Sequence, residues 1–158
     1  MSNPIVTVQN QFIAAFSAID GTGNYETELK KVYQTMMVET PEHPSISIVF
    51  ATPQPANVMD DAGTVFDINM NFGIACFIQS DSDVDNSGKS RIDQFTFFSD
   101  IFRLIQSIRR TYISASPAWN INYKVPLEMT PVEPWNKNIA VFGVRGQIHI
   151  RNLNATLT

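Results

Sequence analysis

The chain has 158 residues, of which 44% are hydrophobic and 16% are charged, with a formal net charge of −4. This composition argues against intrinsic disorder, and the single cysteine excludes an internal disulfide framework and a cysteine-based zinc site. No segment approaches the ~18 consecutive apolar residues of a membrane span, and the N-terminus lacks the pattern of a signal peptide. We therefore expect a single soluble domain over residues 1–158, either cytosolic or part of an assembly.

The charge is distributed unevenly along the chain. Residues 1–79 contain two lysines and eight acids, whereas residues 80–158 contain nine basic and seven acidic residues. No lysine or arginine occurs between Val32 and Gly88. A nonspecific nucleic-acid binder needs clustered basic residues to displace counterions from phosphates, so this pattern argues against DNA binding. The acids are solvated loop residues or, alternatively, form a surface that does not adhere to DNA passing nearby.

The first half of the chain is expected to form one helix and several strands. Residues 4–19 have apolar residues at spacings of three and four, which predicts a helix that ends before Gly21. Residues 26–31 fit a short helix or a loop equally well. The content of β-branched and aromatic residues predicts a strand over 32–40, and alternation predicts a half-buried strand over 43–50.

A long strand is the strongest prediction. Residues 51–63 contain two prolines and two aspartates, which indicates a loop. Apolar residues then occupy every second position from Phe66 to Ile78. A strand of 13 residues spans about 43 Å at ~3.3 Å per residue, far beyond the usual ~5–6 residues. So long a strand is expected to reach past the body of a small domain.

The second half contains the principal helix and the closing strands. The helix is expected from Ser90 or Asp93 to about Tyr112, with Arg109 and Arg110 at its end. It is indicated by apolar residues at helical spacing: Phe95, Phe98, Ile101, Phe102, Ile105, Ile108 and Tyr112. A strand over 119–125, a proline-rich connection carrying Trp135 and a final strand over 142–151 follow. The order α–β–β–β–α–β–β predicts an α+β fold with a mixed or antiparallel sheet, and residues 153–158 are expected to be a flexible tail.

No motif indicates catalysis, a metal or a cofactor. His149 lies on the polar face of a strand and is expected to be solvated or hydrogen-bonded. Residues 83–88 match the first half of a calcium loop, but Gln94 occupies the position of the bidentate glutamate, so a polar connection is favoured. Cys76 follows the apolar face of the long strand and is expected in the core.

The order of elements resembles the tail terminator family of long-tailed bacteriophages, the minor tail protein U type. The resemblance covers nearly the whole chain, from the N-terminal helix to the last strand ending in 144–150. It implies a hexameric ring on the head-proximal end of the tail tube, which stops tube growth and presents a surface to the head–tail connector. It also implies a place in the virion tail neck, assembly in the host cytoplasm, passage of DNA without specific binding, and no enzymatic activity.

The residues add hypotheses of their own to this resemblance. Ring contacts join different patches, so opposite charges on different faces favour closure. Arg109, Arg110, Arg145 and Arg151 are expected to meet acids from residues 39–85 of an adjacent subunit, and Trp135 is a further candidate for the subunit or tube interface. The candidates for lumen-facing acids are Asp60, Asp61, Asp81, Asp83 and Asp85. The alternatives are a head–tail stopper or tail completion protein and, from another class, a small cytosolic α+β binding module or enzyme.

Overall fold

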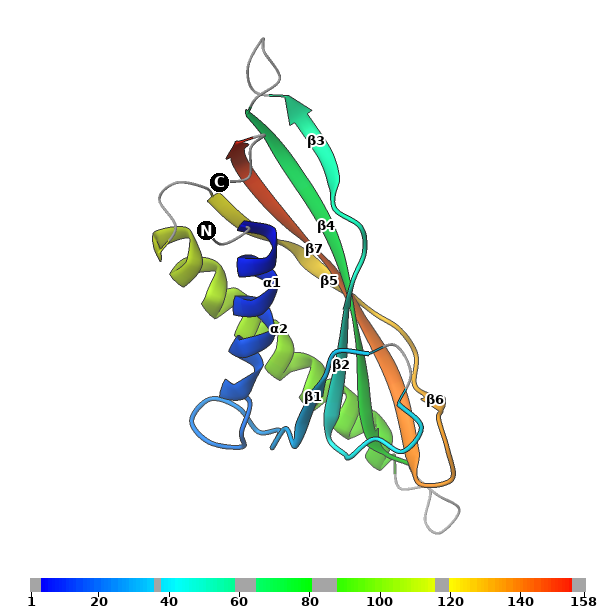
Figure 1. The fold of residues 1–158 in the computed structure, drawn as a ribbon. Helices are drawn as coiled ribbons and strands as arrows, with labels where there is room; N and C mark the ends of the chain where they lie inside the picture. The colour runs from blue at the N-terminus through cyan, green and yellow to red at the C-terminus, as the bar shows by residue number, and fades with distance from the viewer. Residues whose placement is uncertain (1–3, 36–37, 59–64, 81–87, 116–119, 155–158) are drawn as a thin grey trace.

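A mixed β-sheet with two α-helices packed on one face makes up the described part of the computed structural model (Figure 1). The structure describes residues 4–35, 38–58, 65–80, 88–115 and 120–154. The elements in chain order are α1 (Pro4–Ala15), η1 (Phe16–Ala18), β1 (Lys31–Tyr33), β2 (Ser45–Phe50), β3 (Gln54–Val58), β4 (Val65–Gln79), α2 (Lys89–Ala115), β5 (Asn120–Met129), β6 (Glu133–Pro134) and β7 (Ile139–Asn154). The α+β class with an N-terminal and a long second helix is confirmed.

The strands follow the order β1-β2-β4-β7-β5 across the sheet. β1 pairs with β2 in parallel, and the other pairings are antiparallel. β3 pairs with the part of β4 that β2 leaves uncovered, and β6 does the same for β7 beyond β5. Because β7 lies between β4 and β5, the helix α2 carries the chain from one side of β7 to the other.

β4 and β7 form the central ladder of the sheet. They have 15 and 16 residues and pair over 14 positions, from Val65 opposite Asn154 to Gln79 opposite Ile139. The long strand expected over 66–78 is therefore confirmed. Figure 1 shows β3 and the adjoining end of β4 projecting past both helices. The tail expected from 153 is corrected in part: Leu153 and Asn154 pair with β4, and residues 155–158 lie outside the described residues.

The core lies between the helices and the even-numbered side chains of β4 and β7. From α1, Val8 and Phe12 are buried, and the Phe12 ring lies 4.7 Å from that of Phe72 between centroids. From α2, Phe97 and Ile101 are buried. Cys76 is fully buried in this core, as predicted, and burial raises the pKa of its thiol well above the ordinary value.

Two predictions in the first half were wrong in extent. Among the described residues of the strand expected over 32–40, only Val32 and Tyr33 belong to a strand, β1, and the described residues 26–30 before it form no helix. The loop expected over 51–63 contains β3, whose residues include Pro55. β4 offers a free edge beyond β2, and a proline is tolerated in a strand at a sheet edge. Pairing to that edge therefore overrides the local turn signals.

β2 is not the half-buried strand that alternation predicted. Its serines Ser45 and Ser47 are buried although they point away from the helices. The Ser45 hydroxyl donates to the backbone oxygen of Glu42 at 2.5 Å, and the Ser47 hydroxyl donates to that of Thr35. The chain following β1 therefore covers this end of the second face and satisfies both hydroxyls.

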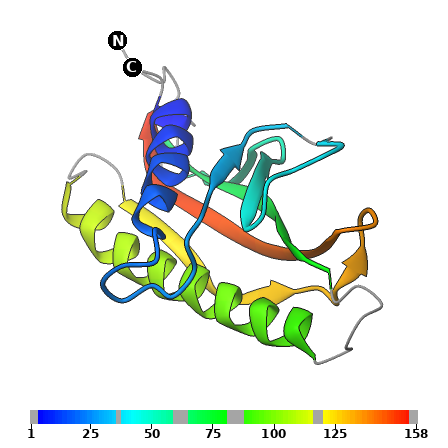
Figure 2. The ribbon, with the colours of Figure 1, turned by 90° about the horizontal axis from the view of Figure 1, so that it is seen from below.

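α2 differs from its predicted limits and stripe. It does not end at Arg109 and Arg110 but continues to Ala115. Phe95, predicted in the core stripe, is 50% exposed, whereas Phe97 is buried. The sequence contains two overlapping apolar stripes on this helix, and the sheet covers the one that includes Phe97, Ile101 and Ile108. Figure 2 shows α2 lying along β5. β5 continues through Pro126, and its pairing register with β7 shifts between Lys124 and Glu128.

Candidate functional site

The face of the sheet opposite the helices carries the polar side chains of the central ladder. The register places Asn71 opposite Gln147, Gly73 opposite Arg145 and Asn69 opposite His149. These are the odd-numbered positions of β4 and β7, which alternate with the buried core residues. Any surface that the sheet offers to a partner on this side is therefore built from these positions.

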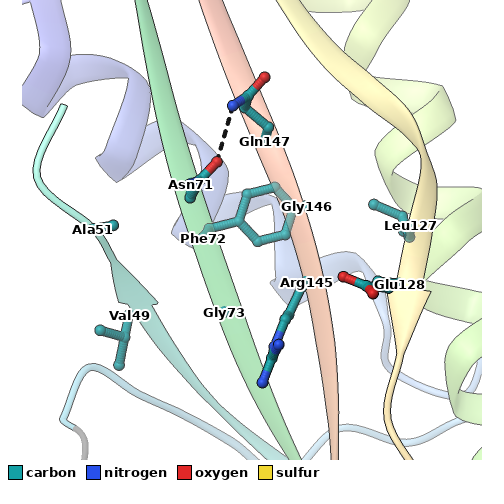
Figure 3. Close-up of a pocket in the computed structure, with 10 residues that line it drawn as sticks. All are labelled: Val49, Ala51, Asn71, Phe72, Gly73, Leu127, Glu128, Arg145, Gly146 and Gln147. Atoms are coloured by element: carbon teal, nitrogen blue, oxygen red, sulfur yellow. Dashed lines mark hydrogen bonds between the residues drawn. The ribbon is translucent and has the colours of Figure 1, made fainter. Parts of the chain in front are cut away.

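An open hollow of about 770 Å³ lies in the middle of this face (Figure 3). Its lining comes from β2, β4, β5, β7 and the residue after β2: Val49, Ala51, Asn71, Phe72, Gly73, Leu127, Glu128, Arg145, Gly146 and Gln147. At Gly73 a Cβ atom would meet nothing within 4 Å, so the absent side chain leaves space in the hollow. The hollow is a depression in the strand surface rather than an enclosed cavity.

Gly146 has a different reason to be a glycine. A Cβ atom there would overlap Phe72 Cζ, lie 2.8 Å from Phe72 Cε1 and lie 2.9 Å from Leu127 Cδ2. The Phe72 ring packs over the backbone of Gly146, as Figure 3 shows, because the two residues are direct cross-strand partners. This close approach positions the strand segment that carries Arg145 and Gln147.

Arg145 is the cation of the hollow. Its side chain is exposed, and no ion pair or hydrogen bond engages it among the described residues. Glu128 is its cross-strand neighbour on β5, yet Figure 3 shows the Arg145 side chain running away from that carboxylate. Beside it, Gln147 Nε2 donates to Asn71 Oδ1 at 2.9 Å. A guanidinium with open donors next to amides is suited to bind a carboxylate or another planar anion.

A buried polar cluster lies further along the same face. His149 is buried, with 9% of its side chain exposed, Nδ1 hydrogen-bonded to Asn69 Oδ1 and Nε2 3.4 Å from Asp67 Oδ2. Asp67 is also buried. Of the two alternatives for His149, the hydrogen-bonded one is confirmed. Because both ring nitrogens already have protein partners and the ring is covered, the geometry suits a structural role better than proton transfer to a substrate.

The sequence did not reveal this cluster. Asp67 and Asn69 occupy alternate polar positions of one strand, and His149 lies 80 residues from Asn69. Only the strand register brings them together, and register is a long-range property.

Trp135 is half-exposed and attached to the sheet. Its ring packs edge-on against Phe77, with centroids 5.3 Å apart, and its Nε1 donates to the backbone oxygen of Val38 at 2.9 Å. Trp135 therefore fixes the segment 38–42 to the uncovered face while 38% of the residue stays exposed.

The remaining candidates cannot be placed in this face. Arg109 and Arg110 belong to α2 and Arg151 to β7, but their side chains lie outside the described part of the structure. The lumen candidates lie outside the described residues altogether: Asp60, Asp61, Asp81, Asp83 and Asp85. Of the proposed interface residues, the structure thus places Arg145 and Trp135.

The described residues support neither a metal centre nor a membrane-spanning helix. Within the described ranges, no three histidine, cysteine or acidic side chains gather as they would around a metal ion. Among the described helices, none combines the length and apolar character that crossing a membrane requires. Gln94, considered as part of a calcium loop, is buried, and its Nε2 donates to the backbone oxygen of Thr130 at 3.0 Å. No model of a known protein family matches the chain, and no curated protein sequence matches it either.

Proposed function

We propose that this chain is a structural protein of a phage virion that caps the head-proximal end of the tail tube as a ring. In this role it stops polymerisation of the tube and provides the surface to which the head–tail connector attaches. Its partners are further copies of itself, the tube protein and the connector or stopper protein. The candidate site is then a subunit contact, and no reaction takes place there.

The observation that carries this proposal is the central ladder with one uncovered face. A ladder of 14 pairs is far longer than a small domain needs, and the helices cover one side of it (Figure 1). The other side carries the open hollow with the unengaged Arg145. Long ribbons with an accessible face and edges suit a protein that shares its sheet surface with neighbours.

A deletion in the phage tests the proposal and separates it from its nearest alternative. Loss of a terminator leaves tube growth unchecked, so we expect tails of uncontrolled length in electron micrographs. Loss of a stopper or completion protein instead gives tails of normal length and heads that leak DNA. Normal tails together with leaking heads would reject the terminator role in favour of the stopper.

A small-molecule binding role is the alternative from another class, and the volume of the hollow is the observation in its favour. Thermal unfolding in the presence of a metabolite panel tests it, because a ligand that binds only the folded state raises the melting temperature. A large shift for one compound, with a chain that stays monomeric beside purified tail tubes, would support this alternative.

A further inference from the structure

We infer that the hollow around Arg145 receives the acidic segment 39–42 of a second copy of this chain. This inference rests on the proposed function, because it names the two surfaces by which neighbouring subunits of the ring meet. The contact joins one cation, Arg145, in one surface hollow to one short acidic segment, which is more specific than a general attraction between basic and acidic faces.

The hollow offers a cationic donor to a carboxylate from outside. Glu128 also lines it, but no ion pair joins Glu128 to Arg145 among the described residues. Arg145 is exposed and forms no ion pair or hydrogen bond among the described residues, so its guanidinium donors are open. The space next to it exists because Gly73 has no side chain, and a Cβ there would touch nothing within 4 Å. Arginine pairs with carboxylates through two parallel hydrogen bonds, so such a contact fixes the orientation of the carboxylate as well as neutralising its charge.

The segment 39–42 has the matching properties. Glu39 and Glu42 are exposed, and neither carboxylate takes part in an ion pair within the described ranges. The segment is held from both ends: Trp135 binds the oxygen of Val38, and the Glu42 amide donates to the Tyr33 hydroxyl at 3.2 Å. Pro41 between the two acids is buried. A segment fixed before binding loses little freedom on binding.

The two surfaces do not meet within one molecule. The segment 39–42 borders the start of β7, since Thr40, Pro41 and Glu42 share a depression with Asn138 and Ile139. Arg145 lies six residues further along β7, which corresponds to roughly 20 Å at ~3.3 Å per residue. An ion pair needs a separation below ~4 Å. The complementary charges are therefore left for contacts between molecules, and a contact of two different patches can close a ring.

Charge reversal tests the contact. Sedimentation velocity measures self-association of the chain, alone and with purified tail tubes. Four proteins are compared: the wild type, Arg145→Glu, the double variant Glu39→Lys with Glu42→Lys, and the triple variant that combines all three changes. We expect each reversal alone to weaken self-association roughly tenfold or more and the combined variant to restore it. Arg91→Glu is the matched control, because Arg91 is an exposed base on α2, and it should leave assembly unchanged.

A steric variant separates the hollow from long-range charge effects. Gly73→Tyr places a ring in the hollow beside Arg145 without altering the net charge, and we expect it to weaken assembly while urea unfolding stays close to that of the wild type. Failure of the combined charge variant to restore assembly would overturn the inference, as would wild-type assembly by Arg145→Glu. A wild-type chain that never self-associates, alone or on tubes, would overturn it too.

The outcome can be distinguished from failure of the proposed function. If the chain caps tubes but the charge variants behave like the wild type, the proposed function stands and the inference fails. If the charge pair controls self-association but deletion leaves tail length unchanged, the contact stands and the terminator role fails.

Discussion

Gly146→Ala is the substitution whose effect follows most directly from the geometry. The new methyl group would overlap the Phe72 ring and approach Leu127 Cδ2 to 2.9 Å. The ring has little room to move away, because Phe72 is 3% exposed and packs against Phe12 with centroids 4.7 Å apart. The backbone of β7 must shift instead, and it is held in the ladder with β4.

The expected cost is that of overpacking a filled core. Forcing extra carbon into such a core costs about 1–3 kcal/mol. For a chain of this length, each kcal/mol lowers the melting temperature by about 2–4 °C, so the whole effect is roughly 2–12 °C. Gly73→Ala is the matched control on the partner strand, where a Cβ meets open space. Alanine there should be neutral or should stabilise by up to about 1 kcal/mol, since glycine disfavours a strand.

Urea unfolding, followed by tryptophan fluorescence, measures both variants. A third variant, Phe72→Leu, supplies the double-mutant cycle: Gly146→Ala should cost clearly less when the large ring is gone. Equal effects of Gly146→Ala and Gly73→Ala, or the same cost of Gly146→Ala with and without the Phe72 ring, would refute the reasoning from close approach.

Three further predictions concern residues outside the hollow. Asp100 is buried and accepts a hydrogen bond from the backbone N–H of Thr27 at 2.8 Å. Asp100→Ala leaves this buried N–H without its acceptor and should lower the unfolding free energy by about 2–3 kcal/mol. An unchanged midpoint in urea would contradict this. Burial raises the pKa of the Cys76 thiol, so alkylation by iodoacetamide at pH 8 should be far slower in the folded than in the urea-unfolded chain; equal rates would show that the thiol is accessible. Raising the pH above about 8.5 ionises the thiol only in the unfolded state, so this group lowers stability with rising pH. Phe95 is 50% exposed, so Phe95→Ser should change the unfolding free energy by no more than about 0.5 kcal/mol, and a larger loss would place Phe95 in the core.

Local patterns predicted the helices and the long strand. Alternation over β4 and the helical stripe of α1 are read within one segment, and a single buried face enforces each of them. They also located Cys76 in the core. Features that depend on a neighbour were harder to predict, because the neighbour is remote in sequence. β3 is a strand because β4 has an open edge beside it, and nothing in its proline-containing sequence indicates that edge.

The site was predictable in its residue type but not in its arrangement. The sequence predicts Arg145 as a cation of a subunit contact, and the structure places it in a hollow. The space beside it depends on Gly73, whose role appears only once the register sets the two residues opposite each other. The attachment of the segment 38–42 by Trp135 joins residues 97 positions apart, which no local pattern contains.

Electron microscopy of labelled protein added to purified tail tubes tests the central claim most directly. The account predicts a ring-shaped cap at one end of each tube, and the label should be absent from the tube wall and from the other end. Label that spreads along the tubes, or that remains entirely in solution, would contradict the claim that the long ladder and its uncovered face serve assembly.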